Sequence, residues 1–440
     1  MKLNDKKTIR AWCVFDWANS VYSLVITSTI FPIYYNSVTT VNGSDIVDFF
    51  GFKVVNSVLY SYALSFSFLI IAALLPLLTG IADASGRKKL FMQVFTYMGG
   101  FACMALFLFD GPNIEFGIIC AIIASISYSG SLVFYNSFLP EIASFDNYDR
   151  ISARGFSYGY IGSVLLLILN LAMIQQPGWF GITSPVFATK FAFLLVGVWW
   201  IGFAQYSFYY LPGNIHNKLP DVKYLLNGYN EIRKVWQSLK ELPTLKKFLW
   251  SFFFYNTGVQ TVLYLAALFA DKELGMEGGE LILTVLIIQI VAILGSYSFA
   301  RLSDYRGNKF SLITMVIIWV FICLAAYLVI DKYQFFILAS IVGMVMGGIQ
   351  ALSRATYSKL IPANTTDHAS YFSFYDVTFN ISIVVGTFSY GLIESLTGSM
   401  RNSALALALF FFVGLGLLAL IKIPRNSQSA LSLGAEDSVR

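Results

Sequence analysis

The sequence predicts an all-α polytopic membrane protein whose twelve transmembrane helices form two six-helix bundles. Of the 440 residues, 57% are hydrophobic and only 12% are charged. A water-soluble protein of this composition would expose more apolar surface than it could cover, so lipid is the expected solvent for most side chains. Twelve apolar stretches reach the length of about 20 residues that a helix needs to cross a bilayer.

The twelve stretches are spread along nearly the whole chain. They begin near Ala11, Ser57, Leu90, Phe116, Ser152, Ala188, Phe248, Leu281, Phe310, Gln334, Ala369 and Ser403. Asp16 and Asn19 interrupt the first, and Asp376 and Asn380 interrupt the eleventh. Because polar groups are costly in hydrocarbon, these two stretches match a membrane span least well among the twelve.

A long polar interruption divides the chain into halves. We expect an N-terminal six-helix bundle over 1–211, a cytoplasmic linker over 212–247 and a C-terminal six-helix bundle over 248–424. The periodicity of apolar residues from Tyr224 to Leu239 predicts an amphipathic helix that lies along the inner membrane face. The Ser-rich tail, 425–440, has little to bury and is expected to be disordered.

The net charge of +5 reports orientation rather than an acidic partner. With the N-terminus inside, most Lys and Arg residues fall in cytoplasmic connections, as the positive-inside rule requires. Both termini are therefore expected in the cytoplasm. Because no transit peptide precedes the first span, a bacterial inner (plasma) membrane is the expected location.

A charged motif recurs in the two halves. Gly80, Asp83, Gly86, Arg87 and Lys88 follow the second stretch, and Asp304 repeats the acidic position 221 residues after Asp83. The first copy resembles the signature between spans two and three of the major facilitator superfamily. In that setting the Asp83 carboxylate is expected to accept hydrogen bonds from arginines or from a helix end and to latch the two halves. The alternative is a solvated loop.

Three further stretches resemble one branch of that superfamily, the vacuole effluxer-like family. They are Phe15-Asp16-Trp17-Ala18-Asn19-Ser20, the run from Asn136 to Ala143 with its continuation through Arg154, and the run from Gly347 to Arg354. The resemblance implies the twelve-helix transporter fold, and the fungal members export amino acids from the vacuole. The match loosens in span eleven, where Asn380 stands at the position at which the resemblance leads us to expect a cationic residue.

Polar side chains inside the spans are the candidates for contact with a substrate or a proton. They are Asp16, Asn19, Tyr135, Asn256, Gln260, Gln350, Arg354, Tyr375, Asp376 and Asn380, with Tyr158 and Gln289 as further midplane groups. In hydrocarbon such groups face helices, water or ligand. For the amides and phenols, a helix-to-helix hydrogen bond is the alternative. For Asp16, the alternative to amine contact or proton carriage is a structural cap or a partner in the inner gate.

Seven residues near the inner ends of the spans are expected to form a gate or conformational latch. They are Asp83, Gly86, Arg87, Lys88, Glu141, Arg154 and Asp304. Arg354 and Asp376 lie at similar depth and are expected to pair, with Glu141 and Arg154 as their counterparts. Such pairs either open during transport or stay closed. If Arg354 instead faces the cavity, its planar guanidinium suits a substrate carboxylate.

These observations favour a secondary active transporter that moves a small solute by alternating access. Amino acids as substrate, efflux as direction and protons as coupling ion are hypotheses at this stage. Multidrug efflux and a non-transporting receptor or scaffold on the same fold are alternatives. We find no motif of a hydrolase, metalloprotease or P-loop enzyme, so no enzymatic activity, metal or cofactor is expected. The expected partners are a small-molecule substrate and membrane lipids, without nucleic acid, and the chain is expected to act as a monomer.

Overall fold

The computed structural model describes residues 3–41, 43–213, 233–363 and 365–424, and long helices dominate it. In this part of the chain, eleven helices are long and apolar enough to cross a membrane. They are α3 (Asn56–Ser85), α4 (Lys88–Ala105), α5 (Ile114–Ser137), α7 (Tyr148–Gln175), α8 (Pro185–Tyr210), α10 (Pro243–Leu274), α11 (Gly278–Arg306), α12 (Asn308–Leu328), α13 (Lys332–Leu360), α14 (His368–Thr397) and α15 (Met400–Ala419). The chain is an integral, multi-pass membrane protein.

The first predicted span is built differently from the others. It consists of α1 (Lys6–Val21), the π-helical segment η1 (Tyr22–Thr29) and α2 (Ile30–Thr39). The hydroxyls of Ser28 and Thr29 donate to carbonyl oxygens five residues earlier, and Pro32 has no N–H to donate, so the α-helical ladder is replaced locally. None of the three segments alone is a helix long enough to cross a membrane, so the count of twelve stays a prediction.

The first outer loop contains a β-hairpin that the sequence did not predict. Strands β1 (Ile46–Phe49) and β2 (Phe52–Val55) pair in antiparallel register, with Phe49 opposite Phe52. Gly51 takes the positive φ that the turn needs. The hairpin is fastened to α5, because the Phe50 amide donates to the Glu115 carboxylate over 3.1 Å.

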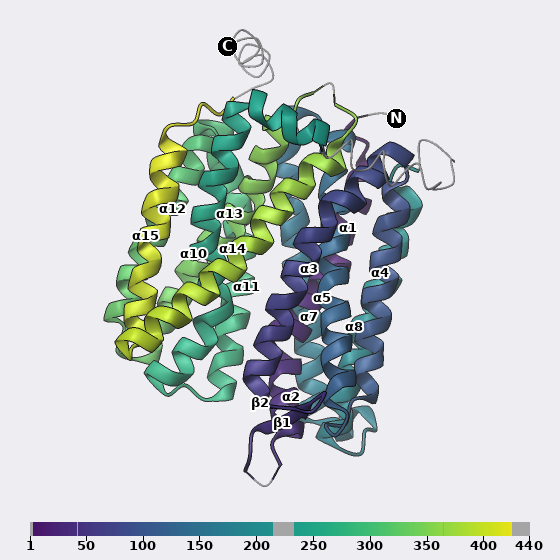
Figure 1. The fold of residues 1–440 in the computed structure, drawn as a ribbon, viewed down its shortest axis with the longest axis vertical. Coiled ribbons are helices and arrows are strands. Elements are labelled where there is room, and N and C mark those ends of the chain that lie inside the picture. The colour runs from purple at the N-terminus through teal and green to yellow at the C-terminus, as the bar shows by residue number, and fades with distance from the viewer. Residues whose placement is uncertain (1–2, 42, 214–232, 364, 425–440) are drawn as a thin grey trace.

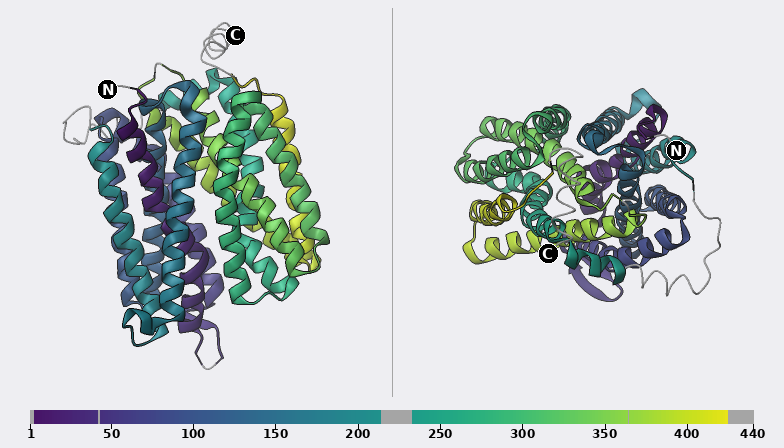
Figure 2. Two further views of the ribbon diagram at one scale, coloured as in Figure 1. Left: turned by 180° about the vertical axis from the view of Figure 1, so that it is seen from behind. Right: turned by 90° about the horizontal axis from the view of Figure 1, so that it is seen from above.

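The helices gather in two groups, α1 to α8 and α10 to α15, which stand side by side (Figures 1 and 2). Helix α1 begins and α15 ends at one end of the molecule, and the β-hairpin lies at the other (Figure 1). We call these ends inner and outer, following the predicted orientation. The groups meet where α14 packs on α3 and α5, and where α7 packs on α11 and α13.

Close helix packing fixes α13, which carries two of the candidate site residues. Gly343 and Gly347 face the backbone of α11, and a Cβ atom at Gly347 would collide with the Ala292 carbonyl. This spacing of small residues is typical of membrane helices that approach closely. Gln350 and Arg354 follow one and two turns later on the same helix.

The proposed domain boundaries differ in one respect from the helices observed. Helix α10 begins at Pro243, which suits the first turn because proline needs no hydrogen-bond partner there, so the helix starts before the expected boundary at Phe248. Residues 233–241 are helical and bury Val235 and Leu239. The remainder of the predicted amphipathic helix, 224–232, and the tail, 425–440, lie outside the described residues.

Candidate substrate and gating site

A cavity of about 240 Å³ lies between the two helix groups. Its wall comes from α1, η1, α3, α5 and α7 on one side and from α10, α11, α13 and α14 on the other. Among the residues singled out in the sequence, those that line it are Asp16, Asn256, Gln260, Gln289, Gln350, Arg354, Tyr375, Asp376 and Asn380. The fold therefore brings side chains from distant parts of the sequence to one chamber.

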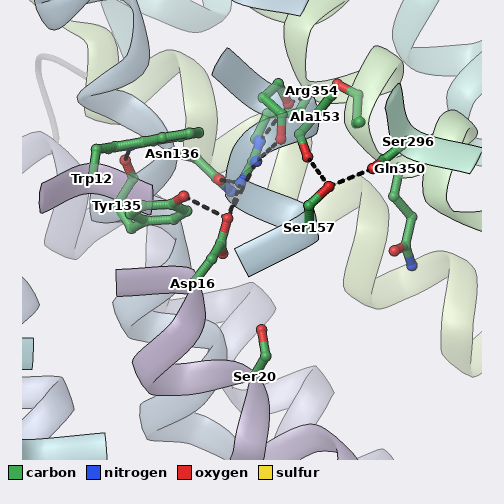
Figure 3. A network of polar contacts seen from close by, with 12 residues as sticks. Trp12, Asp16, Ser20, Tyr135, Asn136, Ala153, Ser157, Ser296, Gln350 and Arg354 are labelled. Atoms are coloured by element: carbon green, nitrogen blue, oxygen red, sulfur yellow. Dashed lines mark hydrogen bonds and ion pairs between the residues drawn. The ribbon is translucent and has the colours of Figure 1, made fainter. Parts of the chain in front are cut away.

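At the inner end of the cavity, Asp16 of α1 and Arg354 of α13 form a buried ion pair between the two halves (Figure 3). Both guanidinium Nη atoms lie 3.4 Å from Asp16 Oδ2, and the Tyr135 hydroxyl donates to the same oxygen over 2.6 Å. The two charged side chains are 3% and 6% exposed. Because both charges are buried, the pair depends on these neighbours for its stability.

Arg354 uses its remaining donors on the N-terminal half as well. Its Nε donates to Ser152 Oγ over 2.9 Å. Its Nη1 donates to Asn136 Oδ1 over 3.3 Å (Figure 3). The guanidinium also lies between the rings of Trp12 and Phe156, at 4.6 and 4.2 Å from their centroids. A planar, delocalised cation suits such stacking, whereas an ammonium does not.

The expected ion pair between Arg354 and Asp376 is wrong, because Arg354 pairs with Asp16. Asp376 takes part in no ion pair among the described residues, and its Oδ2 is buried without a hydrogen-bond partner. Asn136, which accepts from Arg354, lies beside the Asp376 carboxyl group. One amide thus stands between the paired guanidinium and the unpaired carboxylate.

Amide side chains cover much of the C-terminal wall of the cavity. Asn256 Nδ2 donates to Ser382 Oγ over 2.6 Å, and Gln260 Nε2 donates to Asn256 Oδ1 over 3.2 Å. Gln289 Oε1 is buried and lacks a partner in the described part of the chain. Gln350 Oε1 accepts from the Tyr160 hydroxyl over 2.7 Å, which ties α13 to α7.

Three of the predicted site residues do not line the cavity, and a fourth, Tyr375, lines it and also packs on another ring. Asn19 is fully buried and accepts a 3.4 Å hydrogen bond from Ser20. Tyr135 serves Asp16, as described above, and does not line the cavity. Tyr158 accepts from Arg154 over 3.4 Å, and Tyr375 stacks on Phe252 at a centroid distance of 4.3 Å.

A second buried ion pair joins the halves nearer the inner side, and the sequence analysis did not find it. Lys359 Nζ of α13 lies 2.7 Å from Asp149 Oδ2 of α7, and both side chains are 4% exposed. Asn308 and Ser303 also donate to the Asp149 carboxylate, over 2.7 and 3.0 Å. Asp149 lies three residues before a predicted span and Lys359 near the end of another, so both had the pattern of solvated loop charges.

The repeated acidic motif lies at two further contacts between the halves. Asp83 accepts hydrogen bonds from the backbone amides of Ala369 and Ser370, over 3.3 and 2.7 Å, at the first turn of α14. This is the helix-end contact considered in the sequence analysis, where the helix dipole favours a negative charge. Asp304 instead pairs with Arg150 over 3.0 Å.

The other motif residues lie within the N-terminal half. Gly86 ends α3 in the left-handed conformation at a φ of 66°, and the buried Nε of Arg87 has no partner in the described part of the chain. Lys88 forms an ion pair with Glu141. The expected pair of Glu141 with Arg154 is therefore wrong, because each has another partner.

The contacts place the cavity on the outer side of the gate. Helix α1 runs from the inner to the outer side, and its lining residues, with those of η1, lie at or after Asp16. Helix α13 runs in the opposite direction, and its lining residues lie at or before Arg354. The pairs made by Asp149, Asp83 and Asp304 all lie closer to the inner helix ends. The described structure is therefore closed on its inner side.

Comparison with known proteins agrees with this architecture. The family model described as vacuole effluxer Atg22 like matches residues 4–431, almost the whole chain. The chain belongs to this family. It is thus an Atg22-like transporter of the major facilitator type.

Relatives of this Atg22-like chain are found in bacteria and fungi. It is 28% identical over 441 residues to the "Uncharacterized MFS-type transporter YxiO" of Bacillus subtilis, with 98% of both chains covered. It is 24% identical over 492 residues to "Autophagy-related protein 22-1" of Penicillium rubens, covering 92% of this chain and 82% of the relative.

Among solved structures, the proton:xylose symporter XylE, bound to 6-bromo-6-deoxy-D-glucose, aligns with a TM-score of 0.71 at 13% identity. The alignment covers 97% of the Atg22-like chain and 98% of the symporter. At this identity the likeness concerns the fold, which is that of the major facilitator superfamily.

Proposed function

We propose that this Atg22-like chain is a secondary active transporter that exports a small zwitterionic solute, with amino acids as the first class to test, by alternating access. The observation that supports this most strongly is the polar cavity between the halves. Two buried ion pairs, each with one partner in either half, close its inner end. The proposal includes a bacterial plasma membrane with both termini in the cytoplasm, and a monomeric unit.

The chemistry of the cavity supports a zwitterion. All hydrogen bonds that the described residues make to the Asp16 carboxylate end on Oδ2, which leaves Oδ1 to accept from a substrate ammonium. Amides such as Gln260 and Asn256 supply donors for a substrate carboxylate. The volume of about 240 Å³ equals the share of roughly eight water molecules in the liquid, which suits a solute of amino-acid size.

Alternating access explains why charged pairs are placed between the halves. The Asp16–Arg354 and Asp149–Lys359 pairs each join two different bundles, so an opening of the inner side separates all four groups. The entering water then hydrates the separated charges, which lowers the free-energy cost of the opening. An inner opening followed by outer release corresponds to export, the direction that the family description suggests.

The test is counterflow in proteoliposomes, loaded with one unlabelled solute and exposed to its labelled form. We expect exchange of at least one class of amino acids, and we expect Asp16→Asn to abolish it. Asp48→Asn is the matched control, because Asp48 accepts from Gly51 in the outer hairpin, far from the cavity.

Two results would contradict this function. Normal exchange of every accepted solute by a folded Asp16→Asn variant would remove the proposed ammonium contact. A lack of exchange for amino acids, peptides, sugars and nucleosides, combined with export of many hydrophobic compounds by cells that carry the protein, would favour multidrug efflux instead.

A further inference from the structure

The charges at the inner end of the cavity do not balance among themselves. Asp16, Asp376 and Arg354 all line the cavity and are at most 6% exposed. Arg354 is the only cation among the described lining residues, and its ion pair is with Asp16. Asp376 therefore has no cation of its own.

An isolated carboxylate in this place is unstable. Asp376 is 94% buried, given its 6% exposure, and one of its oxygens has no hydrogen-bond partner in the described structure. A buried carboxylate without a counter-charge costs several kcal/mol, so such groups bind a positive charge or become neutral. The neutral state requires only one proton, on the oxygen that is unpartnered.

Apart from Asp16 and Arg354, the described residues that line the cavity around Asp376 carry no charge. Helix α14 packs against α3, α5, α10 and α15. Of the described cavity residues, α3 contributes Phe68 and α15 contributes none. On α5, α10 and α14 the titratable cavity residues besides Asp376 are the phenols of Tyr128, Tyr255, Tyr264 and Tyr375, and α13 and α1 contribute the paired Arg354 and Asp16. Phenols are uncharged near neutral pH, so none of these four compensates the carboxylate.

We propose that Asp376 is the binding site of the coupling proton, whereas Asp16 stays ionised and acts with Arg354 as the gate. This inference rests on the proposed transport function. A proton from water on the outer side adds to Asp376 Oδ2 and forms the O–H bond. After the inner side has opened, that bond breaks and the proton passes to water on the inner side, so one proton crosses per cycle.

The hydrogen bonds around Asp376 favour a proton over a metal cation. Asn136 uses its side-chain oxygen to accept from Arg354, so it is the amide N–H that faces Asp376. An N–H donor beside the carboxylate repels a metal ion, which needs several oxygen ligands. Among the described residues, no group of three or more acidic, Cys or His side chains is arranged to hold a metal.

Asn136 also connects the proton site to the gate. Its side-chain oxygen accepts from Arg354 over 3.3 Å, and its amide lies beside Asp376. A change in the charge of Asp376 therefore changes the electrostatic environment of Arg354, and this ties the proton state of Asp376 to the gate.

The experiment compares two activities of the same proteoliposomes, counterflow exchange and uptake driven by an imposed pH gradient. We expect Asp376→Asn to lower gradient-driven uptake at least about tenfold more than it lowers exchange, a ratio within the usual range of coupling free energies between sites. Asp48→Asn in the outer hairpin should leave both activities at the level of the unmodified protein.

Equal loss of both activities in Asp376→Asn, or uptake that follows a sodium gradient and ignores a pH gradient, would overturn the assignment. Exchange in the unmodified protein tests transport separately, since its absence contradicts the proposed function itself. Infrared difference spectra of the purified protein provide a readout without transport. A carboxylic-acid C=O band that titrates with pH must disappear in Asp376→Asn, and its persistence would place the proton elsewhere.

Discussion

Removing one charge of the buried Asp149–Lys359 pair should shift the chain towards an inward-open conformation. In Lys359→Met the Asp149 carboxylate keeps its hydrogen bonds from Asn308 and Ser303 but loses the ammonium at 2.7 Å. Breaking a buried pair in this way typically costs about 3 to 5 kcal/mol. Because two donors remain, we take the lower end, about 3 kcal/mol.

This cost falls almost entirely on the closed conformation. Once the inner side opens, water reaches Asp149 and hydrates it, so the substitution changes little there. A difference of about 3 kcal/mol corresponds to roughly a hundredfold change in the ratio of open to closed molecules. Asp149→Asn combined with Lys359→Met removes both charges and should restore most of the closed population.

Pulsed electron paramagnetic resonance can measure the shift as a distance between spin labels on the inner ends of the two halves. Leu90 at the start of α4 and Phe310 at the start of α12 are suitable labelling positions, since they are 37% and 46% exposed. The four native cysteines are buried and are not expected to react. Lys359→Met should add a population with a longer distance.

The matched control is Lys272→Met at the outer end. Lys272 pairs with Glu394 over 3.4 Å, but the two side chains are 53% and 29% exposed. Such a surface pair contributes less than about 1 kcal/mol, so the inner distance should not change. If Lys359→Met gives the same distance distribution as the unmodified protein, Asp149 and Lys359 do not act as a gate.

Four other substitutions test the remaining parts of the site. Gly155→Ala would place a methyl group 2.6 Å from Asp16 Oδ2. This overlap costs about 1 to 3 kcal/mol and should lower counterflow markedly. Gly416→Ala is the control, because its methyl group meets open space and should leave counterflow unchanged. Arg354→Lys keeps the charge but loses the planar fork, and should lower the midpoint of thermal unfolding in detergent, because about 2 kcal/mol of buried hydrogen bonding is lost. Asp83→Asn should shift the equilibrium between closed and inward-open molecules towards the open form by about 1 kcal/mol, measured with the same spin labels. Asp304→Asn should shift it by less, because the Asp304–Arg150 pair is partly exposed.

Hydrophobic stretches and intramembrane polar residues carried most of the information about the fold and the cavity. Nine of the polar positions noted in the sequence line one chamber, because a buried polar group in a membrane helix has to face other helices, water or ligand. The choice of partner was not predictable. Whether Arg354 meets Asp16 or Asp376 depends on the rotation and depth of α13 relative to α1 and α14, and helical periodicity within one segment contains neither quantity.

The interrupted first span was beyond prediction for a different reason. A π-helical segment needs only one extra residue per turn, and the composition of η1, with Ser23, Ser28 and Thr29 among apolar residues, also suits an ordinary α-helix. The gate residue Asp149 had a similar ambiguity. It follows Asp146 in a short polar connection, and its burial arises only because α11 and α13 of the other half cover it.

The two copies of the acidic motif show how an internal repeat produces an unsymmetrical gate. At the same spacing of 221 residues that separates Asp83 from Asp304, the counterpart of Ser370 is Asp149. Asp83 can therefore bind the amides at the start of α14, whereas Asp304 would meet a second carboxylate at the start of α7. Like charges repel, and Asp304 pairs with the neighbouring Arg150 instead.

Asp149, which stands where the other copy has Ser370, is buried and needs a counter-charge. Lys359 of the other half supplies it. One side of the gate thus closes on a helix end and the other on a buried ion pair. A helix-end contact contributes about 1 kcal/mol. A buried charge that leaves its partner costs about 3 kcal/mol or more until water reaches it. We therefore expect the inner side to open first at the contact between α3 and α14, and the Asp149–Lys359 pair to separate once water has entered.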